Sequence, residues 1–174
     1  MHQPLAPTGF YHPLTLASLF FLFSILGWIL ETLSYLTMEG VFLNRSILLG
    51  PWIPLYGICG VLSVTMLHRF AKNPILAFCM NGLLYSVIGY LSDFTVQMIW
   101  HADLHKISQY FRPSLLPPFF ADAVFLGLIG CTCQYFIAPK WKQVTRKIPL
   151  WFLLCVCVLL GMLMLLDVFF AFYR

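Results

Sequence analysis

Four acidic residues stand inside long apolar stretches of the sequence and are the best candidates for chemistry: Glu31, Asp93, Asp122 and Asp167. A charge at the centre of a bilayer costs about 2.5–3.5 kcal/mol on insertion scales, so such residues usually face a bundle interior or a wet cavity. Carboxylates gathered in one buried site suit general acid and base work. They could equally line a polar path for ions, protons or a cationic solute. An acid near a helix end can also simply reach the headgroup region.

The stretches that carry these acids have the length and composition of membrane spans. The chain has 174 residues, of which 61% are hydrophobic and only 9% are charged. Soluble domains are about 45–50% apolar and about a quarter charged, and a transmembrane helix needs about 20 mostly apolar residues. The sequence predicts an all-α, polytopic transmembrane bundle of about five helices in one integral membrane domain, residues 1–174. The expected spans are about 16–36, 53–70, 75–100, 119–138 and 150–173.

The order of the spans predicts that the four acids share one side of the membrane. Three of them lie near the end of an odd-numbered span, and Asp122 lies near the start of the fourth. Because successive spans run in opposite directions, these positions reach the same side as the two longer connections. We expect an acidic, hydrated vestibule there, with Arg45 and Arg112 as nearby counter-charges.

Small and polar residues recur at helical spacing on three of the spans, which is typical of helix–helix interfaces in membranes. The stripes are Ser24, Gly27, Glu31 and Tyr35 in the first span, Gly82, Ser86, Gly89, Asp93 and Gln97 in the third, and Gly127, Gly130 and Gln134 in the fourth.

Prolines and tryptophans indicate where the spans begin and end. Proline stands just ahead of three runs, where its fixed φ suits a helix start, and tryptophan falls at run ends, as in an interfacial aromatic belt. These residues are Pro74, Pro118 and Pro149, and Trp52, Trp100, Trp141 and Trp151.

The connection after the first span is unusual because it stays apolar while its helicity is broken. Gly50, Pro51 and Pro54 interrupt any helix in a segment that otherwise reads as apolar. Irregular backbone is tolerated at membrane depth where it is buried in protein or lines a cavity. The sequence is therefore consistent with a re-entrant loop after the first span.

The basic residues lie in short loops, which fits membrane orientation better than nucleic-acid binding. The side that carries the N-terminus has six basic loop residues and no acid: Arg69, Lys72, Lys140, Lys142, Arg146 and Lys147. The positive-inside rule then predicts a cytoplasmic N-terminus and a C-terminus on the outer side.

Recognised catalytic motifs are missing from the sequence. It has no G-x-x-x-x-G-K-[ST] phosphate loop and no Ser/His/Asp or Cys/His motif of known spacing. The six cysteines all lie in apolar runs, where they read as packing residues. His101 and His105 could lie one helical turn apart and join a metal or base site, although a surface pair fits them better. We expect no cofactor, no catalytic residue and no metal site.

A local motif resembles a known family. Gly27, Trp28 and Glu31, then Asn44 and Arg45, then the run of Gly50, Pro51, Pro54, Tyr56 and Gly57 are similar to the bacterial CmpB-like family of ABC-transporter permeases, type IV. The match is good over about residues 23–60, and Asp167 also resembles the closing helix of that family. The resemblance implies a small multi-helix protein of the bacterial inner or plasma membrane. We expect Glu31 and Arg45 to form a charge pair that positions the loop, and its prolines and glycines to shape its backbone.

Three functions remain open on the sequence. The resemblance favours a transport-system membrane subunit of unknown substrate that acts with a separate ATPase subunit or a second copy of itself. The alternatives are an intramembrane enzyme for lipid-linked or headgroup substrates and a structural or regulatory protein that binds another membrane protein. The partners expected in every case include the lipid bilayer and exclude nucleic acid.

Overall fold

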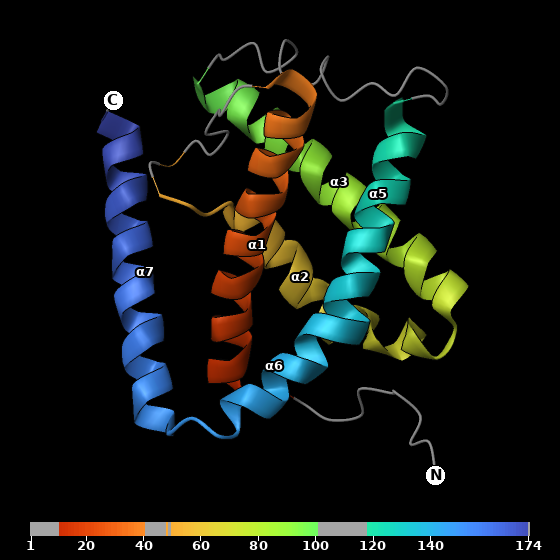
Figure 1. Ribbon diagram of the computed structural model, residues 1–174. Coiled ribbons are helices and arrows are strands. Elements are labelled where there is room, and N and C mark those ends of the chain that lie inside the picture. Colours follow the sequence, from red (N-terminus) through yellow and green to blue (C-terminus); the bar gives the residue numbers. More distant parts are fainter. Residues whose placement is uncertain (1–10, 41–47, 49, 101–117, 174) are drawn as a thin grey trace. The chain divides into compact units, whose positions relative to one another are not determined.

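The computed structural model describes residues 11–40, 48, 50–100 and 118–173 (Figure 1). Every regular element within these ranges is a helix, and these ranges contain no β-strand. The prediction of an all-α fold is therefore confirmed.

Helix α1, Pro13–Glu39, has a defined signal at each end. The His12 ring nitrogen Nδ1 accepts a hydrogen bond from the Leu14 N–H at 3.3 Å, and Pro13 occupies the first helical position. At the other end Gly40 adopts φ 65°, and its N–H bonds to the Leu36 carbonyl at 3.2 Å. A left-handed glycine is a common helix terminator because no Cβ opposes this conformation.

The predicted proline starts are confirmed. Helices α3 and α5 begin at Pro74 and Pro118, and α7 begins directly after Pro149, whose carbonyl accepts the N–H groups of Phe152 and Leu153. Helix α2 also begins at a proline, Pro54, which was predicted only to interrupt a helix. Their bounds are α2 Pro54–Met66, α3 Pro74–Trp100, α5 Pro118–Thr132 and α7 Leu150–Tyr173.

Three of the five predicted spans are helices long and apolar enough to cross a membrane: Pro13–Leu33, Pro74–Leu91 and Leu150–Ala171. The other two predicted spans are helical but composite. Helix α2 has 13 residues before a 3-10 helix at Leu67–Lys72, and α5 has 15 before a π-helical stretch at Cys133–Ile137. At 1.5 Å per residue a 13-residue helix covers about 20 Å, less than a hydrocarbon core of about 30 Å.

The chain forms two compact units, which we name after their longest helices. Among the described residues, the α1–α7 unit comprises 11–40, 48, 50–61 and 138–173, which include α6, Ala138–Thr145, and the α3–α5 unit comprises 62–100 and 118–137.

In the α1–α7 unit, the two long helices lie side by side and run in the same direction (Figure 1). Their shared core is formed by Phe21 of α1 with Leu153 and Cys157 of α7. Leu14, near the start of α1, and Ile148, just before α7, pack against the same cluster. The N-terminal halves of both helices therefore share one end of the unit.

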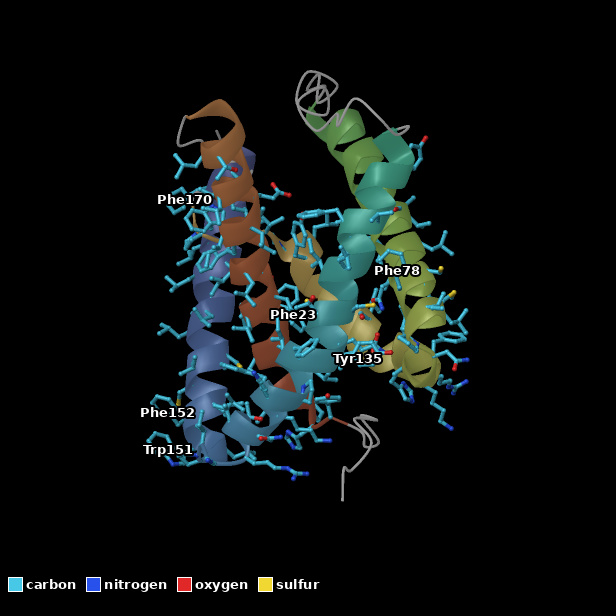
Figure 2. The ribbon with its side chains drawn as sticks, turned by 45° about the vertical axis from the view of Figure 1, so that its right-hand side comes forward. Phe23, Phe78, Tyr135, Trp151, Phe152 and Phe170 are labelled. Atoms are coloured by element: carbon cyan, nitrogen blue, oxygen red, sulfur yellow. The ribbon has the colours of Figure 1, made fainter. Side chains whose placement is uncertain are left out.

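In the α3–α5 unit, glycines allow α5 to approach α3 closely. A Cβ at Gly127 would lie 3.0 Å from the Phe78 carbonyl oxygen, and one at Gly130 would lie 2.6 Å from the Asn81 amide oxygen. The predicted stripe on the fourth span is therefore a helix contact, and its third member, Gln134, is buried as well. Figure 2 shows α3 and α5 side by side and labels Phe78 on α3.

Candidate functional site

The most distinctive site is the end of the loop before α2, which is held inside the α1–α7 unit. Residues 50–53 and the first turn of α2 make polar contacts with α1 and α7 at three points. The acceptors are the Asp167 carboxylate, the Ser24 carbonyl and the Glu31 carboxylate.

Asp167 is the anchor on α7. Its Oδ2 accepts the backbone N–H of Gly50 at 2.7 Å and the indole N–H of Trp52 at 2.9 Å. Both Asp167 and Trp52 are only 8% exposed. A buried carboxylate needs such donors, and hydrogen bonds to a charged acceptor are stronger than those between neutral groups. Asp167 thus joins the loop to α7.

The Ser24 carbonyl marks the depth that the loop reaches. The Ile53 N–H donates to this carbonyl at 3.0 Å, and Ser24 lies near the middle of α1. The hydroxyl of Ser24 donates to the Phe20 carbonyl at 2.8 Å, and the side chain is completely buried. The non-helical backbone just before Pro54 therefore lies beside the centre of an apolar helix, which supports the predicted re-entrant loop.

Glu31 holds the first turn of α2. Its Oε1 accepts the Tyr56 hydroxyl at 3.1 Å, and the ring of Tyr56 lies directly over Gly27, where an added Cβ would collide with it. The expected charge pair of Glu31 with Arg45 stays a prediction, because Asn44 and Arg45 lie outside the described residues. Tyr56 is one partner of Glu31 among the described residues.

The remaining loop residues shape the path of the backbone. A Cβ at Gly57 would lie 2.7 Å from the Phe20 carbonyl, and one at Gly50 would lie 2.5 Å from the Trp52 ring. Pro51 is exposed at the bend, and Pro54 begins α2. The predicted inward face of the first span is confirmed for Ser24, Gly27 and Glu31 by these contacts.

Trp52 corrects the prediction that it belongs to an interfacial belt. Its ring is buried, and its N–H is bonded to Asp167, which lies 115 residues away along the chain. A tryptophan at the end of an apolar run is typical of a membrane interface, and the sequence alone does not show a hydrogen-bond partner that lies far along the chain. Trp151, by contrast, is 68% exposed at the start of α7, as the belt prediction expects.

Asp93 and Asp122 lie on α3 and α5, and the structure describes only the backbone there. The four-acid vestibule and the counter-charges Arg45 and Arg112 are therefore still predictions, and the histidine pair at 101 and 105 also falls outside the described residues. Within the described part of the chain, no three His, Cys, Asp or Glu side chains gather to hold a metal ion.

A buried polar network in the α3–α5 unit was missed by the sequence reasoning. The Asn81 amide nitrogen donates to the Ala77 carbonyl at 2.8 Å and to Gln134 Oε1 at 3.0 Å, while its oxygen accepts the Ser63 hydroxyl at 2.5 Å. The Gln134 amide donates to the Leu67 carbonyl at 3.0 Å. A lone asparagine in the middle of an apolar run was the available signal.

The third-span stripe is confirmed in part: Gly82 is buried and so is the Ser86 hydroxyl, whereas Gly89 departs from the prediction and the side chains of Asp93 and Gln97 lie outside the described residues. The packed side of α3 includes Ala77, Asn81 and Tyr85, which are all buried, whereas a Cβ at Gly89 would meet nothing within 4 Å. Glycine at position 89 is therefore not needed for a close helix approach.

Comparison with known proteins gives the family. The sequence matches the family with the description "Putative ABC-transporter type IV" over residues 18–172. That match covers most of the chain, so the protein belongs to this family, and the resemblance seen in residues 23–60 extends to the last helix. Neither the curated proteins nor the solved structures give a match.

Proposed function

We propose that this protein is the permease-type membrane subunit of a transport system and that it works with a separate ATPase subunit. Membership of the ABC-transporter type IV family supports a transport role. The 174 residues contain no phosphate-binding loop, so an ATPase would have to be supplied elsewhere.

One observation carries the proposal: the loop at residues 50–53 reaches the middle of α1 as irregular backbone and then starts the short helix α2. Transporters commonly build their solute sites from such discontinuous helices, because the exposed ends of the backbone can coordinate a solute. Asp167 and Glu31 hold this loop in place through Gly50, Trp52 and Tyr56. A carboxylate that positions a loop in this way favours transport over acid and base catalysis.

The proposal is tested by purification of the tagged protein from its own membranes in mild detergent, followed by mass spectrometry of the proteins that co-purify. We expect an ATPase with a phosphate-binding loop to accompany the wild type and the Gly89→Ala variant. We expect the Asp167→Leu variant to lose it, because the loop is released from α7. Purification of the wild type alone, or only with copies of itself, would contradict the proposal.

A further inference from the structure

A basic surface lies at the end of the α1–α7 unit where both long helices begin. It comprises α6 and the turn that follows it, with Lys140, Arg146 and Lys147 all exposed. The buried side of α6 carries Ala138 and Thr145. Helix α6 is therefore amphipathic and turns Lys140 outward, and Arg146 and Lys147 extend the basic surface beyond its end.

Helix α6 is fixed to the start of α1. The Trp141 indole N–H donates to the Ser18 hydroxyl at 2.9 Å, and the Lys142 ammonium lies 4.7 Å from the centre of the Tyr11 ring. Burial raises the pKa of Tyr11, so its ring stays neutral beneath the lysine. One basic side chain is thus used internally, and the other three define the outward basic surface.

No acid is placed in the sequence near this surface to neutralise it. Residues 1–30 and 123–166 contain neither Asp nor Glu. The nearest acids along the α1–α7 unit, Glu31 and Asp167, lie toward the opposite ends of their helices and accept bonds from the loop. The three exposed cations therefore have no acid of this unit close to them in the sequence, and they are available to an anion from outside.

Large apolar side chains follow the basic turn immediately. Leu150, Trp151 and Phe152 are 61%, 68% and 49% exposed at the first turn of α7, which begins one of the candidate membrane spans. Figure 2 shows Trp151 and Phe152 at that end of α7, together with nitrogen-tipped side chains. Cations beside an exposed tryptophan at the start of a span match the chemistry of a lipid headgroup layer.

We propose that α6 and residues 146–149 bind the headgroup phosphates of anionic lipids, with Lys140, Arg146 and Lys147 as the cationic contacts and Trp151 inserted at the interface. An acidic protein would satisfy the charges, but it would leave Leu150, Trp151 and Phe152 without an apolar environment. An anionic lipid supplies both the negative charges and the apolar environment. This interaction does not depend on transport.

The test uses purified full-length protein in mixed vesicles of phosphatidylcholine and phosphatidylglycerol, in which increasing fractions of either one lipid or the other are brominated. The brominated lipid quenches tryptophan fluorescence. The difference between the wild type and Trp151→Phe isolates the quenching of Trp151. The variant K140Q/R146Q/K147Q is compared with R69Q/K72Q, which removes two cations from the α3–α5 unit.

We expect phosphatidylglycerol to be preferred over phosphatidylcholine around Trp151, with a loss of about fivefold in this preference for each basic residue removed. The R69Q/K72Q control should keep the preference, and added salt should weaken it in the wild type, because screening shortens the range of the attraction. The salt series needs no variant, so it stays informative if the triple variant does not fold.

Equal quenching by brominated phosphatidylcholine and brominated phosphatidylglycerol in the wild type would overturn the proposal. A preference that survives in the triple variant would overturn it as well. The surface is a protein-binding site instead if two results occur together. The wild type shows no lipid preference, and in the detergent purification an acidic protein accompanies the wild type but not the triple variant.

Discussion

At the scale of single residues, Asp167 supplies the hydrogen-bond acceptor that two donors of the loop need. The Trp52 indole N–H is buried and the Gly50 N–H is half-buried, and an unsatisfied donor in an apolar environment is costly. Both donors bond to one carboxylate oxygen. The acid is tolerated on an apolar helix because it is the shared acceptor for the loop.

Replacement of Asp167 should therefore release the loop. We expect Asp167→Leu to lower the stability of the protein in detergent by about 2–4 kcal/mol, since two bonds to a charged acceptor are lost. Asp167→Asn keeps an acceptor oxygen and should lose less than half as much. The midpoint of thermal unfolding is measured by gel filtration of heated samples. A red shift of Trp52 emission is measured as well. Wild-type midpoints in both variants would show that the anchor has no energetic role.

The glycines allow a second test at this scale. Gly57→Ala places a methyl group against the Phe20 carbonyl, which belongs to the backbone and cannot turn away, so we expect a loss of about 1–3 kcal/mol. Gly89→Ala is the matched control, because a Cβ there meets nothing within 4 Å, and the higher helix propensity of alanine should leave stability unchanged or slightly raised. Equal losses in the two variants, in the same unfolding assay, would contradict the close contact of α2 with α1.

At the scale of elements, polar side chains join helices that apolar packing alone would leave free to slide. In the α3–α5 unit, Asn81 of α3 binds Gln134 of the π-helical stretch and Ser63 of α2. Gln134 also binds the Leu67 carbonyl, where α2 gives way to the 3-10 helix. Because lipid tails are as apolar as leucine, such hydrogen bonds select one register among similar ones.

Loss of this network should weaken the α3–α5 unit. We expect Asn81→Leu to lower stability by about 1–2 kcal/mol, because interhelical hydrogen bonds in membranes average about 0.6 kcal/mol and the two to Gln134 and Ser63 are removed. The check is an unfolding titration with sodium dodecyl sulfate, followed by circular dichroism.

Ser86→Ala is the control for this experiment. The Ser86 hydroxyl is buried on the same helix and has no hydrogen-bond partner among the described residues. Its removal should therefore leave the titration midpoint unchanged. A larger loss in Ser86→Ala than in Asn81→Leu would mean that the network does not hold the unit together.

At the scale of the whole molecule, the direction of the long helices constrains topology. Helices α1 and α7 run in the same direction in one unit. If both cross the bilayer, the chain must return between them, and the number of crossings is odd. The number of crossings is odd whether only the three long helices or all five predicted spans cross the bilayer.

The parity predicts that the two termini lie on opposite sides of the membrane. With the basic loops in the cytoplasm, we expect a green fluorescent protein fused after Arg174 to be dark and an alkaline phosphatase fused there to be active, with the reverse pattern for fusions before Met1. Identical behaviour of the fusions at both ends would show an even number of crossings.

The sequence by itself determined the helical class, the three long apolar helices, the proline starts, and the inward positions of Ser24, Gly27 and Glu31. These features depend on composition and on spacing within one helix, which a sequence displays directly. The tertiary structure decided that Trp52 is buried, that Asp167 accepts from Gly50 117 residues away, and that Asn81 meets Gln134. Such pairs depend on which helix faces pack together, and no local pattern records that choice.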